Sequence, residues 1–134
     1  MVTIIFESHG TTTDNERHLA SGWADCPLSE LGIQQSKEMG QRYADEYFDA
    51  VFCSDLQRSY KTAEIAFAGK SIPIIQDKRL RECDYGDFAR RQVWEVEREK
   101  KNYISHPFPN GESYEETMAR MKDFFVNLLR DYMG

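Results

Sequence analysis

Three side chains of types that handle phosphate follow three apolar runs of this sequence. His9 ends the run in IIFESHG, Arg58 follows the run in AVFCSDLQR, and Glu82 follows IPII, within RLRECDYGDF. An imidazole can attack phosphorus, a guanidinium can bind two phosphate oxygens, and a carboxyl group can protonate a leaving oxygen. This combination predicts phosphoryl-transfer chemistry.

Small hydrogen-bonding residues surround the histidine. Gly10 permits a close backbone approach, and Thr11, Thr12 and Asn15 offer donors to an anion. Each feature also has a plain structural explanation, because a histidine can end a loop, an arginine can lie on a helix surface, and Glu82 is one of 23 acidic residues. Spacing alone therefore leaves two interpretations open, a phosphate site and ordinary loop and surface residues.

The apolar runs have the composition of strands. Residues 2–6 show little alternation, which predicts a strand covered on both faces. Residues 50–53 form a second such run, and residues 72–75 form a third, which Pro73 restricts to a sheet edge or a strand start.

Four segments have the composition or the capping pattern of helices: residues 29–48, residues 54 onward, residues 90–101 and residues 113 onward. Ser54 with Gln57, and Ser113 with Glu116, each match the capping box that opens a helix. In the last segment, apolar residues recur at steps of three and four, which predicts one buried face.

The alternation of strands and helices predicts an α/β fold with a mostly parallel sheet and helices on both faces, in a single domain over residues 1–134. Ligands of such folds bind at the carboxyl ends of the strands. If the first two strands are neighbours, His9 and Arg58 converge there with the free N–H groups of the helix at Ser54, and such a helix start favours an anion.

Charge, cysteine content and the lengths of apolar stretches argue against several classes of function. The chain has 17 basic and 23 acidic residues, a net charge of -6 and no run of Lys and Arg, which argues against nucleic-acid or anionic membrane partners. Its three cysteines are far apart and lack a CxxC pair, which predicts buried thiols rather than disulfides. With no metal-binding spacing and no long apolar stretch, we expect a soluble, cytoplasmic chain without metal or cofactor.

Five stretches resemble, in order, the motifs of the histidine phosphatase superfamily: SHGTTTDN, GWADCPLSELG, FCSDLQRSYKTAE, LRECDYGDF and FPNGESYEE. The family versions are Arg-His-Gly-x-Thr-x-x-Asn, Gly-Trp-x-Asp-x-Pro-Leu-Ser/Thr-x-Leu-Gly, Ser-Ser-Asp-Leu-x-Arg, Leu-x-Glu-x-x-x-Gly and Gly-Glu-Ser. The matches cover nearly the whole chain. The resemblance implies a three-layer, phosphoglycerate mutase-like α/β fold.

The resemblance also implies roles for individual residues. His9 would attack phosphorus and become phosphohistidine, and Glu82 would protonate the leaving oxygen and then help to activate water. The implied phosphate-binding positions are Arg58, Asn15, Ser8, Thr11 and Gly22. The implied substrate is a small phosphorylated metabolite. The short segment between Glu82 and Gly111 favours hydrolysis over mutase chemistry.

The chain departs from the family pattern in two places. Ser8 stands where the family has an Arg, and a hydroxyl cannot neutralise phosphate charge. The family's last strand, with its second His-Gly pair, has no counterpart, since neither His18 nor His106 lies in such a context. A central strand would then have an open edge.

These departures leave several alternatives. The sequence is a fragment, or a short chain whose open edge is covered by a second copy in a homodimer, or a degenerate product. Two functions follow: a phosphomonoester hydrolase of weakened activity, and a non-catalytic relative that binds phosphate or a phosphorylated metabolite or serves a merely structural role.

Overall fold

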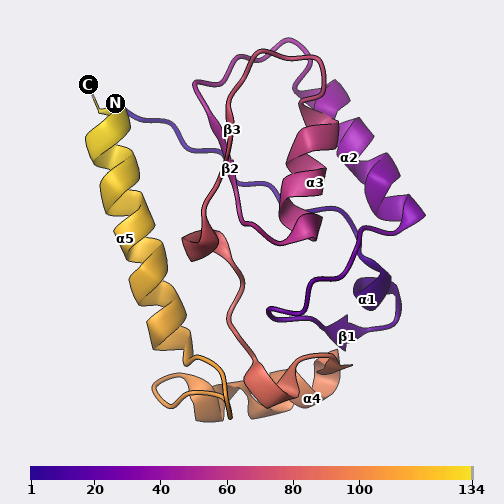
Figure 1. Ribbon diagram of the computed structural model, residues 1–134, viewed down its shortest axis with the longest axis vertical. Coiled ribbons are helices and arrows are strands. Elements are labelled where there is room, and N and C mark those ends of the chain that lie inside the picture. The colour runs from indigo at the N-terminus through magenta and orange to yellow at the C-terminus, as the bar shows by residue number, and fades with distance from the viewer. Residues whose placement is uncertain (134) are drawn as a thin grey trace.

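Two short parallel strands lie between helices in the computed structural model, which describes residues 1–133. Strand β2 (Val51–Cys53) pairs with β3 (Ile74–Gln76), with Val51 opposite Ile74. Helices α2 (Glu30–Arg42) and α3 (Gln57–Ala66) lie on one side of this pair, and α5 (Tyr114–Tyr132) lies on the other (Figure 1). The arrangement is a three-layer α/β unit with helices on both faces.

A second group of short elements closes the end of the molecule at which α5 begins (Figure 1). The elements are α1 (Thr13–Glu16), β1 (Leu19–Ala20), the 3-10 turns η2 (Gly86–Phe88) and η3 (Lys100–Tyr103), β4 (Arg91–Gln92) and α4 (Val93–Glu99). The 3-10 turn η1 (Lys78–Leu80) follows β3 and lies beside the middle of α5 (Figure 1). Strand β1 pairs antiparallel with β4, so the segment after His9 meets the segment that leads into α4.

Two small apolar cores support these groups. One gathers Met39, Ala66 and Phe67 between α2 and α3, and the other gathers Cys83, Tyr85, Val96 and Phe108 beneath α4. Aromatic rings stabilise the second core, where Phe108 meets Tyr85 edge to face at a centroid distance of 5.2 Å. The segment after Glu82 is therefore rooted in the same core as α4.

Helix α5 begins as its sequence pattern predicts. The Ser113 hydroxyl accepts a hydrogen bond from the Glu116 N–H, and the Glu116 side chain returns to the Ser113 N–H, so the predicted capping box is confirmed. Phe124 and Leu128 are buried, but Met118 and Leu129 on the expected apolar face are exposed. The predicted buried face is therefore only partly covered.

The prediction of a strand at residues 2–6 is wrong. Within the described residues this segment has no strand partner, and Ile5 and Phe6 are 53% and 76% exposed. Apolar, β-prone residues form a strand only where a neighbouring strand takes up their backbone hydrogen bonds. The segment borders a hollow of about 680 Å³, together with β2 and α5. That a second copy covers this edge stays a prediction.

The prediction of a capping box at Ser54 and Gln57 is also wrong. Helix α3 begins after Leu56, and the Ser54 hydroxyl accepts from the Leu56 N–H instead. The Gln57 N–H at the start of α3 donates to Asp25 Oδ1 at 2.8 Å. The expectation that this N–H group is free to bind an anion is therefore wrong.

Two helices are shorter than predicted. The helix expected over residues 29–48 ends at Arg42. The helix expected over residues 90–101 begins at Val93, because Arg90 has a φ of 66°, outside the helical region.

The cysteine prediction agrees with the structure. Cys26, Cys53 and Cys83 are free and buried, and burial raises the pKa of the Cys53 thiol to about 11. Across residues 1–133 no cluster of three or more His, Cys, Asp or Glu side chains has metal-binding geometry. The helices in this part of the chain are also too short or too polar to cross a bilayer.

Stability should depend on pH through carboxylates paired with arginine. Hydrogen bonds from Arg81 lower the pKa of Asp55 from its ordinary value of 3.8. Burial alone would raise the pKa of Glu112, but hydrogen bonds from Arg120 and from the Asp84 N–H outweigh it, and the net change from 4.5 is downward. Because both pKa values are lower in the folded state, this stabilisation is complete above the unfolded-state values and is lost as pH falls through the folded-state values.

The urea midpoint should therefore be flat between about pH 5.5 and 7 and should fall below about pH 4. Urea unfolding followed by circular dichroism across this range checks the expectation. Asp55→Asn should lower the plateau and make the acid limb shallower. A midpoint that stays constant down to about pH 3 would contradict the prediction.

Candidate active site

Four of the predicted site residues line one cavity of about 130 Å³. His9 comes from the turn before α1, Asn15 from α1, Arg58 from the first turn of α3, and Glu82 from the segment after η1. The rest of the lining is Leu19, Ala20, Ser21, Tyr85, Val93, Val96 and Glu97. Residues from four separate segments of the sequence thus face a common hollow, as the positions after the apolar runs predict.

The His9 ring has one nitrogen committed to the backbone. Its Nδ1 lies 2.6 Å from the Gly10 carbonyl oxygen. A carbonyl oxygen only accepts hydrogen bonds, so the proton of the neutral ring is assigned to Nδ1 and the lone pair to Nε2. The exposed imidazole therefore keeps a nucleophilic nitrogen.

The turn that carries His9 is anchored to both neighbouring helices. The Gly10 N–H donates to Thr62 Oγ1 of α3 at 3.0 Å, and the Thr11 N–H and hydroxyl donate to Gln35 Oε1 of α2 at 2.8 and 2.9 Å. Gly10 also packs against Gly32, so a methyl group at Gly10 would come within 2.4 Å of the Gly32 carbonyl oxygen. This contact requires glycine.

Arg58 is a buried cation held by backbone carbonyls. Its side chain is 4% exposed, Nη1 donates to Ala24 O at 3.0 Å, and Nη2 donates to Gly22 O at 2.6 Å. The same Nη2 lies 3.3 Å from Glu82 Oε2. These bonds fix the guanidinium plane at the edge of the cavity, where it supplies the positive charge that a phosphate requires.

Glu82 is held through its carboxylate and through its backbone. Oε1 accepts from the Tyr85 hydroxyl at 2.9 Å, and Oε2 faces Arg58. Burial, then the charge of Glu82, raises the pKa of Tyr85, so the phenol stays a donor across the physiological range. The Glu82 carbonyl oxygen accepts from Trp23 Nε1 and from Arg120 Nη2, both at 2.8 Å.

Arg120 of α5 fixes the whole segment that carries Glu82. Its Nη1 donates to the carbonyl oxygens of Arg79 and Arg81, both at 2.7 Å. Its Nε and Nη2 form a two-pronged ion pair with Glu112, each at 2.9 Å. A single side chain thus ties Glu82 to the long helix.

Asn15 faces the cavity from a constrained position. Its Oδ1 accepts from the Thr12 N–H at 2.9 Å, and its own N–H donates to the Thr12 hydroxyl at 3.0 Å, in a capping box that opens α1. Because the amide oxygen is occupied, the NH₂ group is the part of the side chain left to donate to an anion.

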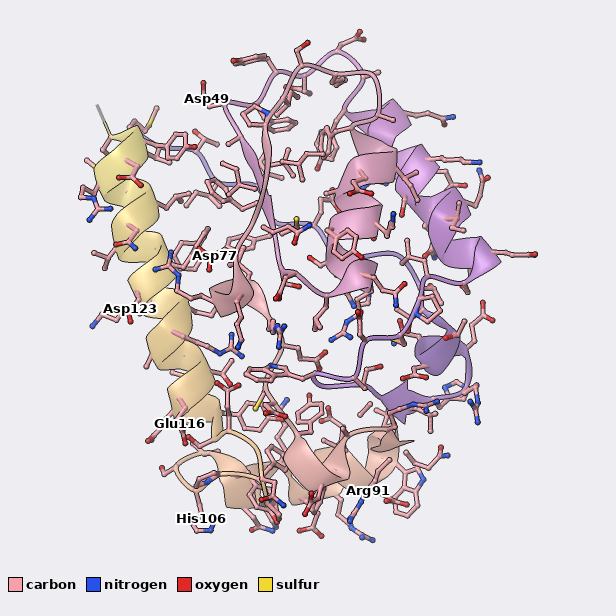
Figure 2. All side chains as sticks on the ribbon, in the orientation of Figure 1. Asp49, Asp77, Arg91, His106, Glu116 and Asp123 are labelled. Carbon is pink, nitrogen blue, oxygen red and sulfur yellow. The ribbon has the colours of Figure 1, made fainter. Side chains whose placement is uncertain are left out.

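The structure does not bring every predicted position to the cavity. Ser8 borders the larger hollow, the Thr11 donors are bonded to Gln35, and Gly22 contributes its carbonyl oxygen to Arg58. The binding roles of these three residues stay predictions. Figure 2 places His106 at the outer edge of the loop before α5, consistent with its interpretation as a loop residue.

Sequence reasoning missed the residues that position Glu82. Trp23 and Tyr85 lie inside the recognised motifs, but nothing in their spacing says that they bond to Glu82. Arg120 reaches the Glu82 carbonyl from 38 positions away, and Glu97 comes to the cavity from the charge-rich helix α4. No signal in a single sequence identifies such contacts.

Comparisons with known proteins agree with this geometry. The chain matches the family described as "Histidine phosphatase superfamily (branch 1)" over residues 4–134. It is 39% identical over 131 residues to "Fructose-2,6-bisphosphatase TIGAR" of Xenopus tropicalis, which covers 91% of this chain and 48% of that protein.

Solved structures show the same fold. A putative alpha-ribazole-5'-P phosphatase from Escherichia coli superimposes with a TM-score of 0.83 at 26% identity, covering 93% of this chain and 66% of that one. A phosphoglycerate mutase from Bacillus anthracis gives a TM-score of 0.79 at 23% identity, a likeness of fold alone, over 92% and 65% of the two chains. The chain thus spans about half to two-thirds of the length of these relatives.

The predicted phosphoglycerate mutase-like α/β fold is therefore confirmed. The family match covers nearly the whole sequence, and the motifs on which the resemblance rests supply the residues of one cavity. We conclude that this chain belongs to the histidine phosphatase superfamily, branch 1.

Proposed function

We propose that this chain hydrolyses phosphomonoesters of small metabolites through a phosphohistidine at His9. The observation that carries the proposal is the cavity in which His9, Arg58, Glu82 and Asn15 meet. It combines a nucleophile, a fixed cation, a proton donor and an amide donor, which are the parts that phosphoryl transfer requires.

In the first step, Arg58 and Asn15 hold the non-bridging oxygens, and Nε2 of His9 attacks phosphorus. The bond from phosphorus to the ester oxygen breaks, and Glu82, in its carboxylic acid form, gives its proton to that oxygen as the alcohol leaves. The hydrogen bond from Nδ1 to the Gly10 carbonyl oxygen strengthens as the ring becomes positively charged.

In the second step, water attacks the phosphorus of phosphohistidine. The phosphorus–nitrogen bond breaks, the Glu82 carboxylate accepts the proton of the water, and inorganic phosphate leaves. Tyr85 and Arg58 hold the two oxygens of this carboxyl group, so that it can serve as acid and then as base without leaving its place.

Similarity to proteins named as phosphatases supports hydrolysis as the reaction. The proposal extends to a cytoplasmic setting, in keeping with three buried free thiols. It also includes a second copy of the chain as the cover for residues 2–6, whose apolar side chains are exposed.

A phosphoenzyme should form at His9 during turnover. The protein is mixed with p-nitrophenyl phosphate, quenched in alkali within the first turnover, and examined by intact-mass and peptide mass spectrometry. We expect one phosphoryl group on the peptide that contains His9, stable in alkali and lost in acid, because a phosphorus–nitrogen bond is acid-labile.

His9→Asn should hold substrate without acquiring the label, and it serves as the matched control. Turnover without any labelled enzyme, or with an acid-stable label on Ser or Thr, would overturn the proposal.

One observation favours a second function, binding of phosphate without turnover. Ser8 supplies no cation, and Arg58 already donates to two carbonyl oxygens and faces Glu82. In that case inorganic phosphate raises the melting temperature, while the labelling experiment gives no phosphoenzyme.

A further inference from the structure

The cavity has a second carboxylate besides Glu82, and helix α4 supplies it. Glu97 of α4 lines the hollow next to Val93 and Val96. Within residues 1–133 the Glu97 side chain makes no hydrogen bond or ion pair, in contrast to Glu82, which is held by Tyr85 and Arg58. The catalytic scheme does not use Glu97.

Two arginines that precede α4 in the sequence are turned to other partners. Arg90 donates to buried Asp14 at 3.2 and 3.3 Å. Arg91 packs its guanidinium on the Phe88 ring at 4.1 Å, and Figure 2 places it at the outer surface beside α4. Among the residues that line the cavity, Arg58 is the one guanidinium, against the two carboxylates of Glu82 and Glu97.

The lining separates into two halves. His9, Asn15, Arg58 and Glu82 surround the place of the phosphoryl group, so the alcohol of the ester must lie against the rest of the lining. That remainder consists of Leu19, Ala20, Ser21, Tyr85, Val93, Val96 and Glu97. The hydroxyls of Ser21 and Tyr85 already donate to Asp14 and Glu82, and the one charge in this half, on Glu97, is negative.

We propose that Glu97 determines specificity: it makes the site prefer phosphomonoesters whose alcohol carries a cationic amine, and reject those whose alcohol carries a second anion. The proposal rests on the hydrolysis proposed above. A carboxylate attracts an ammonium group and repels a carboxylate or second phosphate, and apolar neighbours reduce the screening by water. Because Glu97 is exposed, the expected preference is modest, about five- to tenfold per unit charge at low salt.

Three esters of equal size test the charge directly: phosphoethanolamine, ethylene glycol monophosphate and phosphoglycolate, whose alcohols are cationic, neutral and anionic. We expect kcat/KM to fall in that order for the wild-type protein. Glu97→Gln should reduce the ratio of the first to the third to near one, and Glu97→Lys should invert it.

Glu95→Gln, on the same helix but outside the cavity, is the matched control and should keep the wild-type order. Raising the salt concentration to about 0.5 M should shrink the preference of the wild-type protein, because screening weakens exposed charges.

Binding gives a second readout that does not need turnover. Thermal shifts caused by the three esters in the His9→Ala variant should follow the same order, with the same response to Glu97→Gln. If no ester is hydrolysed, the proposed function fails, and these shifts still decide the role of Glu97. A preference for phosphoglycolate, or an order that Glu97→Gln leaves unchanged, overturns the inference.

Discussion

Replacement of His9 by alanine should lower kcat for p-nitrophenyl phosphate by at least about a thousandfold, because His9 is the one imidazole that lines the cavity and the proposed mechanism passes through its phosphohistidine. Tyr85 is buried and its phenol donates to Glu82, so it offers no substitute. Stability should change by less than about 0.5 kcal/mol, since the exposed ring bonds only to its neighbouring carbonyl. Steady-state kinetics and thermal melting measure the two effects separately.

His106→Ala is the matched control, since it removes an exposed imidazole from a loop outside the cavity. Its rate should equal that of the wild-type protein. Hydrolysis by the His9→Ala protein at the wild-type rate would show that His9 is not the nucleophile. A large loss of stability would show that His9 also supports the fold.

Replacement of Arg120 by alanine should be the most destabilising of the changes considered. Glu112 would lose its partner while only 15% of its side chain is exposed, and the carbonyl oxygens of Arg79, Arg81 and Glu82 would lose a donor. Stranding a largely buried carboxylate costs on the order of 3 kcal/mol. Urea unfolding should show this loss.

The same change should also affect turnover. The segment that carries Glu82 would lose its tie to α5, so kcat should fall about tenfold or more while KM for the phosphoester changes less, because Arg58 is held independently.

Arg120→Lys keeps the charge but lacks the planar fork, and it should recover part of the stability and little of the rate. Leu128→Ala, a destabilising change farther along the helix, should leave kcat near the wild-type value at temperatures where it is folded. If both variants alter kcat equally, Arg120 has no specific positioning role.

The convergence of Arg58 and Glu82 was predictable because both follow predicted strands that form and lie side by side. Arg58 lies just beyond β2, and Glu82 lies just beyond the turn that follows β3, so their neighbourhood follows from the layer order. The donors that hold Glu82 could not be predicted, because Arg120 and Trp23 reach it across the fold. Such tertiary hydrogen bonds leave no periodic pattern in the sequence.

The two capping patterns show the same limit at the scale of one helix turn. Ser113 caps α5 as predicted, because its hydroxyl accepts from the Glu116 N–H and the Glu116 side chain accepts from the Ser113 N–H. At Ser54 the same pattern fails, since Asp25, from a distant part of the chain, accepts the hydrogen bond of the Gln57 N–H. The predicted strand at residues 2–6 does not form for a related reason: a β-prone composition cannot supply the neighbouring strand that it needs.

The contact of Gly10 with Gly32 has a consequence for how the turn at His9 tolerates substitution. The turn that carries His9 is positioned by backbone atoms packed against backbone atoms. No side-chain rotamer can change there to relieve a steric clash. A single added methyl group at either glycine would collide with backbone atoms on the other side of this contact and displace the turn that carries His9.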